Sequence, residues 1–289
     1  MDYIEFPTHY VYNNNILIIK YHFNSNINLI KFDSNITSVL FTNSVGFSVI
    51  IKYINNNEEC NNASIFNQPV DNLPQNLLNI TFGYYFNQHV DNLPQNLINL
   101  TFGNNFNQLV DNLPQSIQNL TFASCFNCTV NNLPLNLHNL TFGYYFNQSV
   151  DNLPQGLLNL TFSSNFNQFV DNLPQTLLNL TFGCDFNQPV NNLPQNITNL
   201  NFDCGFNQSV EDLPNSLITL SFNKNYIYKQ EFDKHLNSLP NTISEIRLPI
   251  NYVQEILIIP SNLKKIICSS TYKFINNFDN NILIEKLII

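Results

Sequence analysis

Carboxylates recur at a fixed spacing in this 289-residue chain. If each 20-residue segment formed one coil of a stack, these aspartates would align in a column, and aligned carboxylates can bind Ca²⁺. Asn131 and Asn191 interrupt the column, however, and no glycine-rich loop follows it to wrap an ion. Capping of a turn explains both Asp and Asn, so we expect no metal. The aspartates are Asp71, Asp91, Asp111, Asp151 and Asp171.

Six cysteines are too few and too scattered for a disulfide framework. Cys125 and Cys128 form a lone Cys-x-x-Cys pair, without a further Cys or His at a spacing that would complete a zinc site. Cys184 and Cys204 are one period apart, which places them on adjacent coils at a separation that a disulfide tolerates. In a reducing compartment we expect both to be thiols.

No catalytic arrangement is evident in the sequence. His89 and His138 occupy variable positions, and neither has a nucleophile or a carboxylate in a fixed relation to it. The chain contains no triad, phosphate-binding loop or dinucleotide fingerprint. We therefore expect that the protein is not an enzyme and uses no cofactor.

These residues are positioned by a 20-residue unit that occurs eight times. The first copy reads Phe66-Asn-Gln-x-Val-Asp-Asn-Leu-Pro74 and ends in Leu77-x-x-Ile80-Thr-Phe82. A fixed period of this length is the signature of a solenoid, in which one coil packs on the next. The later copies start at Phe86, Phe106, Phe126, Phe146, Phe166, Phe186 and Phe206.

The end of each unit matches the Leu-x-x-Leu-x-Leu segment that forms one strand per coil in leucine-rich repeats. Ile80 and Phe82 should point inward, and Asn79 and Thr81 outward. Pro74 cannot lie inside a central strand, so it belongs to the return segment. We predict a leucine-rich-repeat-like solenoid with one short parallel strand per 20-residue coil, turns or 3₁₀ segments on the convex side and little α-helix.

We expect a single solenoid domain over residues 1–289. The regular repeats occupy 61–223, and the ends, 1–60 and 224–289, carry degenerate coils that serve as caps. The degenerate copies include Ile36-x-x-Val39-x-Phe41, Ile243-x-x-Ile246-x-Leu248, Leu263-x-x-Ile266-x-Cys268 and Ile284-x-x-Leu287-x-Ile289.

The net charge of −9 is unevenly distributed, because no Lys or Arg lies between Lys52 and Lys224. Nucleic acids and anionic membranes attract basic surfaces, so we expect neither as a partner. The first residues lack a basic segment followed by an apolar stretch, and no apolar run approaches the ~20 residues of a membrane helix. We expect an intracellular protein.

One asparagine position of the unit never varies, whereas the residues after each strand vary most. An Asn at a tight turn can bond backbone groups of its own coil and of the next coil, so we predict that these asparagines form a buried structural ladder. Its members are Asn87, Asn107, Asn127, Asn147, Asn167 and Asn187.

The variable residues form a rim in which partner recognition would be encoded, and tyrosine is a favoured contact residue. We predict two Tyr–Tyr pairs as binding anchors; neutral drift at solvated turns is the alternative. The pairs are Tyr84 with Tyr85 and Tyr144 with Tyr145. We predict a non-catalytic module that binds an unknown protein through the concave sheet face and this rim. The alternative is a structural, self-assembling repeat protein without a specific partner.

The unit Phe-Asn-Gln-Pro/Ser-Val…Leu-Pro…Leu-x-x-Leu-Thr-Phe-Gly resembles the FNIP repeat, a relative of the leucine-rich repeat found in social amoebae and giant viruses. The resemblance covers residues 66–222 and is closest at Phe66–Val70 and Phe186–Val190. It implies an interaction module, sometimes joined to an F-box or a kinase domain, although residues 1–60 show neither motif. For a viral protein it implies a host partner and the host cytoplasm.

Overall fold

The computed structural model describes residues 10–13, 15–19, 24–25, 35–41, 64–222 and 232–287. These residues form a leucine-rich-repeat-like parallel β-solenoid of about 11 turns, with about 20 residues per turn and almost no helix. The fold class predicted from the sequence is thereby confirmed.

The chain forms two compact units, residues 1–143 and 144–289. The boundary lies within the regular repeats, after Gly143, so each unit contains several regular coils and one end of the chain. The single domain expected from the continuous repeat stays a prediction.

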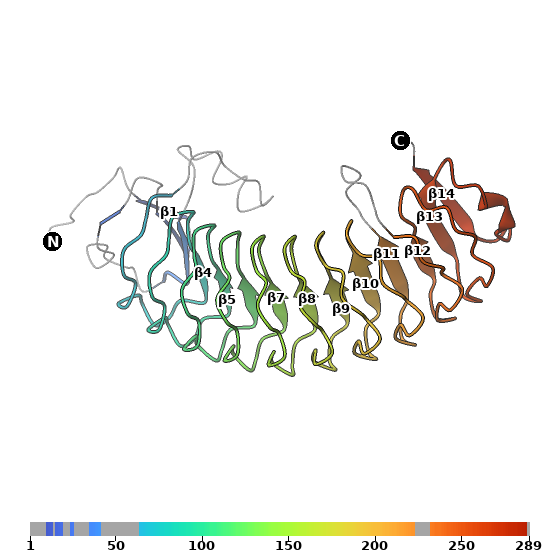
Figure 1. Cartoon of the computed structure of the whole chain (residues 1–289). Helices are drawn as coiled ribbons and strands as arrows, with labels where there is room; N and C mark the ends of the chain where they lie inside the picture. The colour runs from blue at the N-terminus through green and yellow to red at the C-terminus, as the bar shows by residue number, and fades with distance from the viewer. Residues whose placement is uncertain are drawn as a thin grey trace, which may run out of the picture. The chain divides into compact units, whose positions relative to one another are not determined.

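In the described part of the first unit, the strands follow one another in chain order (Figure 1). The first two strands pair antiparallel, and the pairs after them are parallel. Neighbouring regular strands pair with a shift of one period, Asn79 opposite Asn99. The strands are β1 (Tyr10–Asn13), β2 (Ile16–Ile19), β3 (Ser38–Phe41), β4 (Asn79–Thr81), β5 (Asn99–Thr101), β6 (Asn119–Thr121) and β7 (Asn139–Thr141).

The strands in the described part of the second unit also follow chain order, and neighbouring strands pair in parallel. Its last coil contains a short 3₁₀ helix, η2 (Ile275–Asn277). The strands are β8 (Asn159–Thr161), β9 (Asn179–Thr181), β10 (Asn199–Phe202), β11 (Thr219–Phe222), β12 (Glu245–Arg247), β13 (Lys265–Ser269) and β14 (Leu283–Leu287).

The core of each unit consists of stacked apolar columns. Six positions of the repeat are buried in every regular coil, and each such side chain contributes ~1.5–3 kcal/mol. The ring of Phe82 stacks on Phe86 at 3.8 Å, and Phe86 lies 6.1 Å from Phe106 one coil further on. In the first coil these positions are Phe66, Val70, Leu73, Leu77, Ile80 and Phe82. The predicted inward orientation of Ile80 and Phe82 is confirmed.

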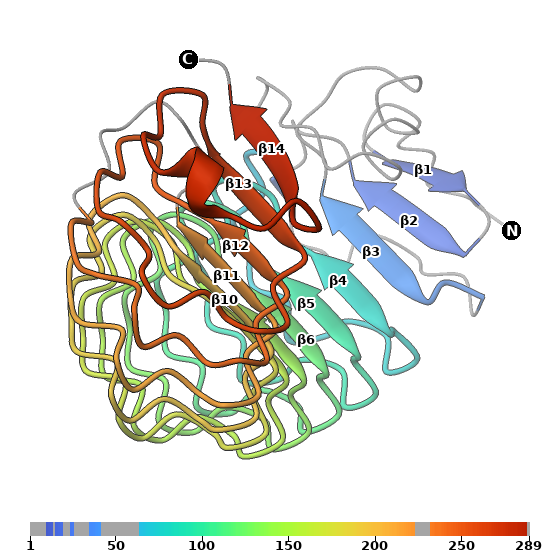
Figure 2. The ribbon, with the colours of Figure 1, turned by 90° about the vertical axis from the view of Figure 1, so that its right-hand side faces the viewer.

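The strands lie on one side of the coils and the return segments on the other (Figure 2). The return is built from turns, and the N–H of Leu77 closes one of them by donating to the carbonyl of Pro74 at 3.3 Å. The same bond recurs one period later, from Leu97 to Pro94 at 3.2 Å. In the part of the chain that the structure describes, 3₁₀ helix occurs at η2 and not in the regular returns.

The degenerate coils fit the predicted pattern at β3, β12 and β13, but β14 has a different register. Ile284 lies opposite Ile266, the position that the sequence pattern gave to Leu287. That prediction was wrong by three residues. The return before β14 lacks the Leu-Pro pair of the other coils, so no residue of the sequence marks where its strand begins.

Candidate functional site

Three residues follow the core phenylalanine at the end of each regular strand, Gly83 to Tyr85 after Phe82 for example, and form the rim of the coil. Their backbone is fixed by a hydrogen bond to the preceding coil: the N–H of Asn105 donates to the carbonyl of Tyr84 at 2.9 Å. The N–H of Cys125 donates in the same way to Asn104 at 2.8 Å. In the second unit Asp185 donates to Ser164 at 2.8 Å. Because this bond uses backbone atoms, it does not depend on the side chain at the third rim position.

Both predicted tyrosine pairs lie on the rim, one in each unit. In the first unit Tyr84 is half-buried and Tyr85 is 45% exposed, and their rings meet edge to face at 4.9 Å. In the second unit Tyr144 and Tyr145 are 46% and 52% exposed, with ring centroids 4.8 Å apart. Edge-to-face contact stabilises aromatic pairs, so each tyrosine restricts the orientation of the other.

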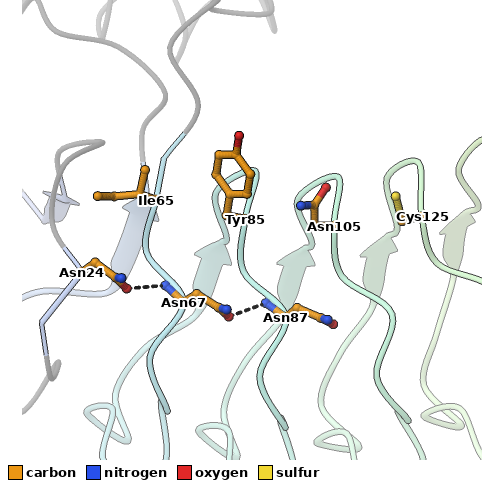
Figure 3. A pocket seen from close by; sticks show the side chains of 7 residues that line it. All are labelled: Asn24, Ile65, Asn67, Tyr85, Asn87, Asn105 and Cys125. Carbon is orange, nitrogen blue, oxygen red and sulfur yellow. Dashed lines mark hydrogen bonds between the residues drawn. The ribbon is translucent and has the colours of Figure 1, made fainter.

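A surface depression in the first unit joins the rim to the asparagine ladder (Figure 3). On the side of the rim, successive coils contribute an aliphatic, an aromatic, an amide and a thiol side chain. Asparagines form the other wall, and none of the seven lining residues is charged. The rim residues are Ile65, Tyr85, Asn105 and Cys125, and the asparagines are Asn24, Asn67 and Asn87.

The invariant asparagines link successive coils by one repeated hydrogen bond. The Oδ1 atom of Asn67 accepts from the N–H of Asn87 at 2.9 Å, and Asn67 itself donates to Asn24 (Figure 3). The second unit repeats the bond from Asn167 to Asn147 at 3.0 Å. The asparagines are half-buried or exposed, contrary to the expected burial, because their turn lies at the surface beside the rim.

The aspartate column is held by a second repeated bond. The Oδ1 atom of Asp71 accepts from Nδ2 of Asn92 in the next coil at 3.1 Å, and Asp151 accepts from Asn172 at 3.0 Å. The column therefore bridges coils, whereas the sequence suggested only that it caps turns. Asparagine retains an acceptor oxygen, which explains why Asn131 can replace aspartate.

The outer face of the strands carries a third ladder, made of side-chain amides. Nδ2 of Asn99 donates to Oδ1 of Asn79, and Asn119 donates to Asn99 at 2.5 Å. In the second unit Asn199 donates to Asn179 at 2.6 Å. The amides thus bond along the stack, as parallel strands in register allow.

The FNIP Repeat family matches residues 89–125 and 146–185. Within these two stretches the chain resembles the FNIP repeat. Its structure is similar to the crystal structure of the giant-virus protein CroV588, described as a novel circular LRR protein, with 25% sequence identity and a TM-score of 0.57. The match covers 97% of this chain and 55% of CroV588, so this chain spans about half the length of that protein. No curated protein matches this chain.

FNIP repeats are usually non-catalytic. Among the described residues, no helix is both long and apolar enough to cross a membrane. In the second unit, two neighbouring coils bring together a cluster that the sequence reasoning found only in part. One side-chain ligand atom from each of Cys184, Asp203 and Cys204 lies within 4.8 Å of the other two.

The cluster is half-buried, and its carboxylate is held in place. Oδ1 of Asp203 accepts from the N–H of Cys204 at 2.8 Å. Burial raises the pKa of the Cys184 thiol to about 12 and also raises the pKa of the Cys204 thiol. The spacing of the cysteines was visible in the sequence, whereas Asp203 was missed. The signal was an acidic residue at a rim position that holds Gly183 one coil earlier.

Proposed function

We propose that this FNIP-repeat solenoid is a non-catalytic protein-binding module whose partner contacts the variable rim and the adjoining outer face of the strands. The fold is typical of protein-binding modules. The observation that carries the proposal is the contrast at the rim. Its backbone makes the same inter-coil bond from repeat to repeat, while its side chains differ from coil to coil.

The tyrosine pairs are suited to be the anchors of such a contact. Tyr85, Tyr144 and Tyr145 are each close to half exposed although they are large aromatic residues. A tyrosine loses little conformational entropy on binding, and an edge-to-face neighbour reduces that loss further. Hot spots of protein interfaces are enriched in tyrosine for this reason.

The surroundings of the tyrosines restrict the chemistry of the partner. The depression beside Tyr85 is lined by aliphatic, aromatic, amide and thiol groups, which suits a mixed protein surface. The repeats between Lys52 and Lys224 contain acidic residues but no Lys or Arg. A partner surface that is neutral or basic would therefore associate faster than an acidic one.

The test compares the intact chain with a variant in which Tyr85→Ser and Tyr145→Ser are combined. The matched control combines Leu135→Ser and Phe169→Ser, which change side chains 74% and 62% exposed outside the rim. Each chain is used as bait in amoebal lysate, and a photo-crosslinking residue at position 85 or 135 reports which surface is touched. Loss of one hot-spot tyrosine costs about 2 kcal/mol, or about 30-fold in affinity.

We expect the intact chain and the control to retain the same partner, and the tyrosine variant to lose it. Crosslinks should form from position 85 and not from position 135. Retention of the partner by the tyrosine variant, or equal loss in the control, would contradict the proposal. Growth of mass with concentration without a captured partner would instead favour the self-assembling alternative.

A further inference from the structure

We infer that the rim of the second unit contains a binding site for a soft divalent metal ion, formed by the Sγ atoms of Cys184 and Cys204 and the carboxylate of Asp203. The three ligand atoms lie within 4.8 Å of one another. They come from two consecutive FNIP repeats, so the ion would bridge adjacent coils.

The repeat explains why the two thiols meet. Cys184 and Cys204 occupy the same rim position in coils that pack directly on each other, as the pairing of β9 with β10 shows. Gly205 permits the close approach, because a Cβ atom there would lie only 2.0 Å from the carbonyl oxygen of Cys184. The N–H of Cys204 then fixes the carboxylate of Asp203 beside its own thiol.

The ligand set selects the class of ion. Thiolates are soft ligands that prefer Zn²⁺ and related ions, whereas Ca²⁺ and Mg²⁺ prefer oxygen. A tetrahedral Zn²⁺ with sulfur at about 2.3 Å holds two sulfurs about 3.8 Å apart, and the ligand atoms of this cluster lie within 4.8 Å of one another. Two thiolates and one carboxylate leave a fourth position for water, since the cluster is half-buried.

The charge around the cluster favours a cation. Asp185 and Asp203 both add negative charge near Cys204, and the sequence places no Lys or Arg between Lys52 and Lys224. A bound cation is the largest local charge in such a site and keeps a coordinating thiol deprotonated. Binding displaces the thiol protons, so the apparent affinity for the ion rises with pH.

A disulfide between Cys184 and Cys204 is the competing use of the same sulfurs. A disulfide between the two cysteines does not need the carboxylate of Asp203. A metal ion would lose one of its three protein ligands if that carboxylate were removed. The substitution Asp203→Asn therefore separates the two possibilities: it leaves both thiols in place and removes the anionic ligand.

The test uses the full chain, reduced with a non-chelating phosphine and titrated with Co²⁺ and then with Zn²⁺. We expect one Co²⁺ per chain, with thiolate-to-cobalt charge-transfer absorption that Zn²⁺ abolishes. Cys184→Ser and Cys204→Ser should each lose the absorption, and Asp203→Asn should weaken binding about tenfold or more. Cys125→Ser, a rim cysteine of the first unit, is the matched control and should bind like the unsubstituted chain.

Absence of the charge-transfer absorption in the reduced chain would overturn the inference. So would equal binding by the Cys204→Ser variant and the control, or undiminished affinity in Asp203→Asn. Far-ultraviolet circular dichroism of each metal-free variant establishes that it is folded, and Cys204→Ala replaces Cys204→Ser if the serine variant is not. The test is independent of the tyrosine test, because it changes other residues and measures metal binding alone.

Discussion

Asn87 shows how a half-exposed side chain can hold two coils together. Its Oδ1 atom accepts from the N–H of Asn107 at 2.9 Å and from Nε2 of Gln108 at 3.1 Å. One oxygen thus satisfies two donors of the next coil. Repeated at each coil, such bonds fix the distance and the rotation between neighbours, while the apolar columns supply most of the stabilisation.

Asn87→Ala should lower the free energy of unfolding by about 1–3 kcal/mol, because both donors lose their acceptor. Water can partly replace the lost acceptor at this half-exposed site, so we expect a loss in the free energy of unfolding near the lower end of that range. Urea unfolding followed by circular dichroism measures the change. Leu135→Ala, at a side chain that is 74% exposed, is the control and should stay within about 0.5 kcal/mol of the unsubstituted chain. If the two variants are equally stable, the ladder contributes nothing.

The sequence predicted buried residues better than surface ones. Ile80 and Phe82 were placed correctly because strand alternation and burial leave a single arrangement. The partner of Asp71 was not predicted, because an exposed carboxylate can accept from its own turn or from the next coil at similar cost. The same freedom explains why Asp203 was missed beside Cys204.

At the scale of the strand, β14 is attached to the second unit by a surface ion pair as well as by backbone bonds. Nζ of Lys265 in β13 lies 2.9 Å from Oε2 of Glu285 in β14. The hydrogen bond from Lys265 lowers the pKa of Glu285, and the same bond raises the pKa of Lys265. Most side chains of β14 are exposed, so apolar burial contributes little to its attachment.

We expect acid to loosen β14 before the regular coils. The pKa of Glu285 in the folded chain is below its unfolded value of about 4.3, so its contribution is complete above that pH and is lost as pH falls through the lowered folded value. The contribution of Lys265 is complete below its unfolded pKa of about 10.4 and is lost as pH rises through the raised folded value. Both are therefore present at neutral pH.

Hydrogen-exchange protection factors of the β14 amides measure this effect. They should be lower at about pH 2 than at about pH 7. Glu285→Gln should be less protected at neutral pH and should change less with pH. The amides of β9, a strand made of uncharged residues, provide the internal control. An equal acid response in β9 and β14 would show that the ion pair has no local role.

At the scale of the whole molecule, the period of 20 residues is the unit that can be removed or added. Equivalent positions of neighbouring coils differ by one period, and Asn79 and Asn99 pair in the sheet with this spacing. Removal of one period therefore leaves each remaining coil with a matching neighbour. Removal of half a period places strand residues against return residues and exposes the core.

Deletion of residues 91–110 should consequently give a folded protein, whereas deletion of residues 91–100 should not. Both deletions begin at the same residue of the first unit. The longer one removes a whole period and keeps the register of the coils, and the shorter one removes half a period and shifts it. Cooperative thermal unfolding followed by circular dichroism distinguishes them. A cooperative transition in the half-period deletion, or none in the full-period deletion, would show that the stack does not depend on the register of its coils.

The inter-coil side-chain bonds give the chain a direction. In the three ladders the later coil supplies the donor and the earlier coil the acceptor, as from Asn87 to Asn67, Asn92 to Asp71 and Asn99 to Asn79. A ribosome releases the N-terminal coils first, so a newly made coil within a unit meets acceptors that are already in place. Each coil can thus fold onto the coil before it while the chain is still being synthesised. Folding does not have to wait for the C-terminus.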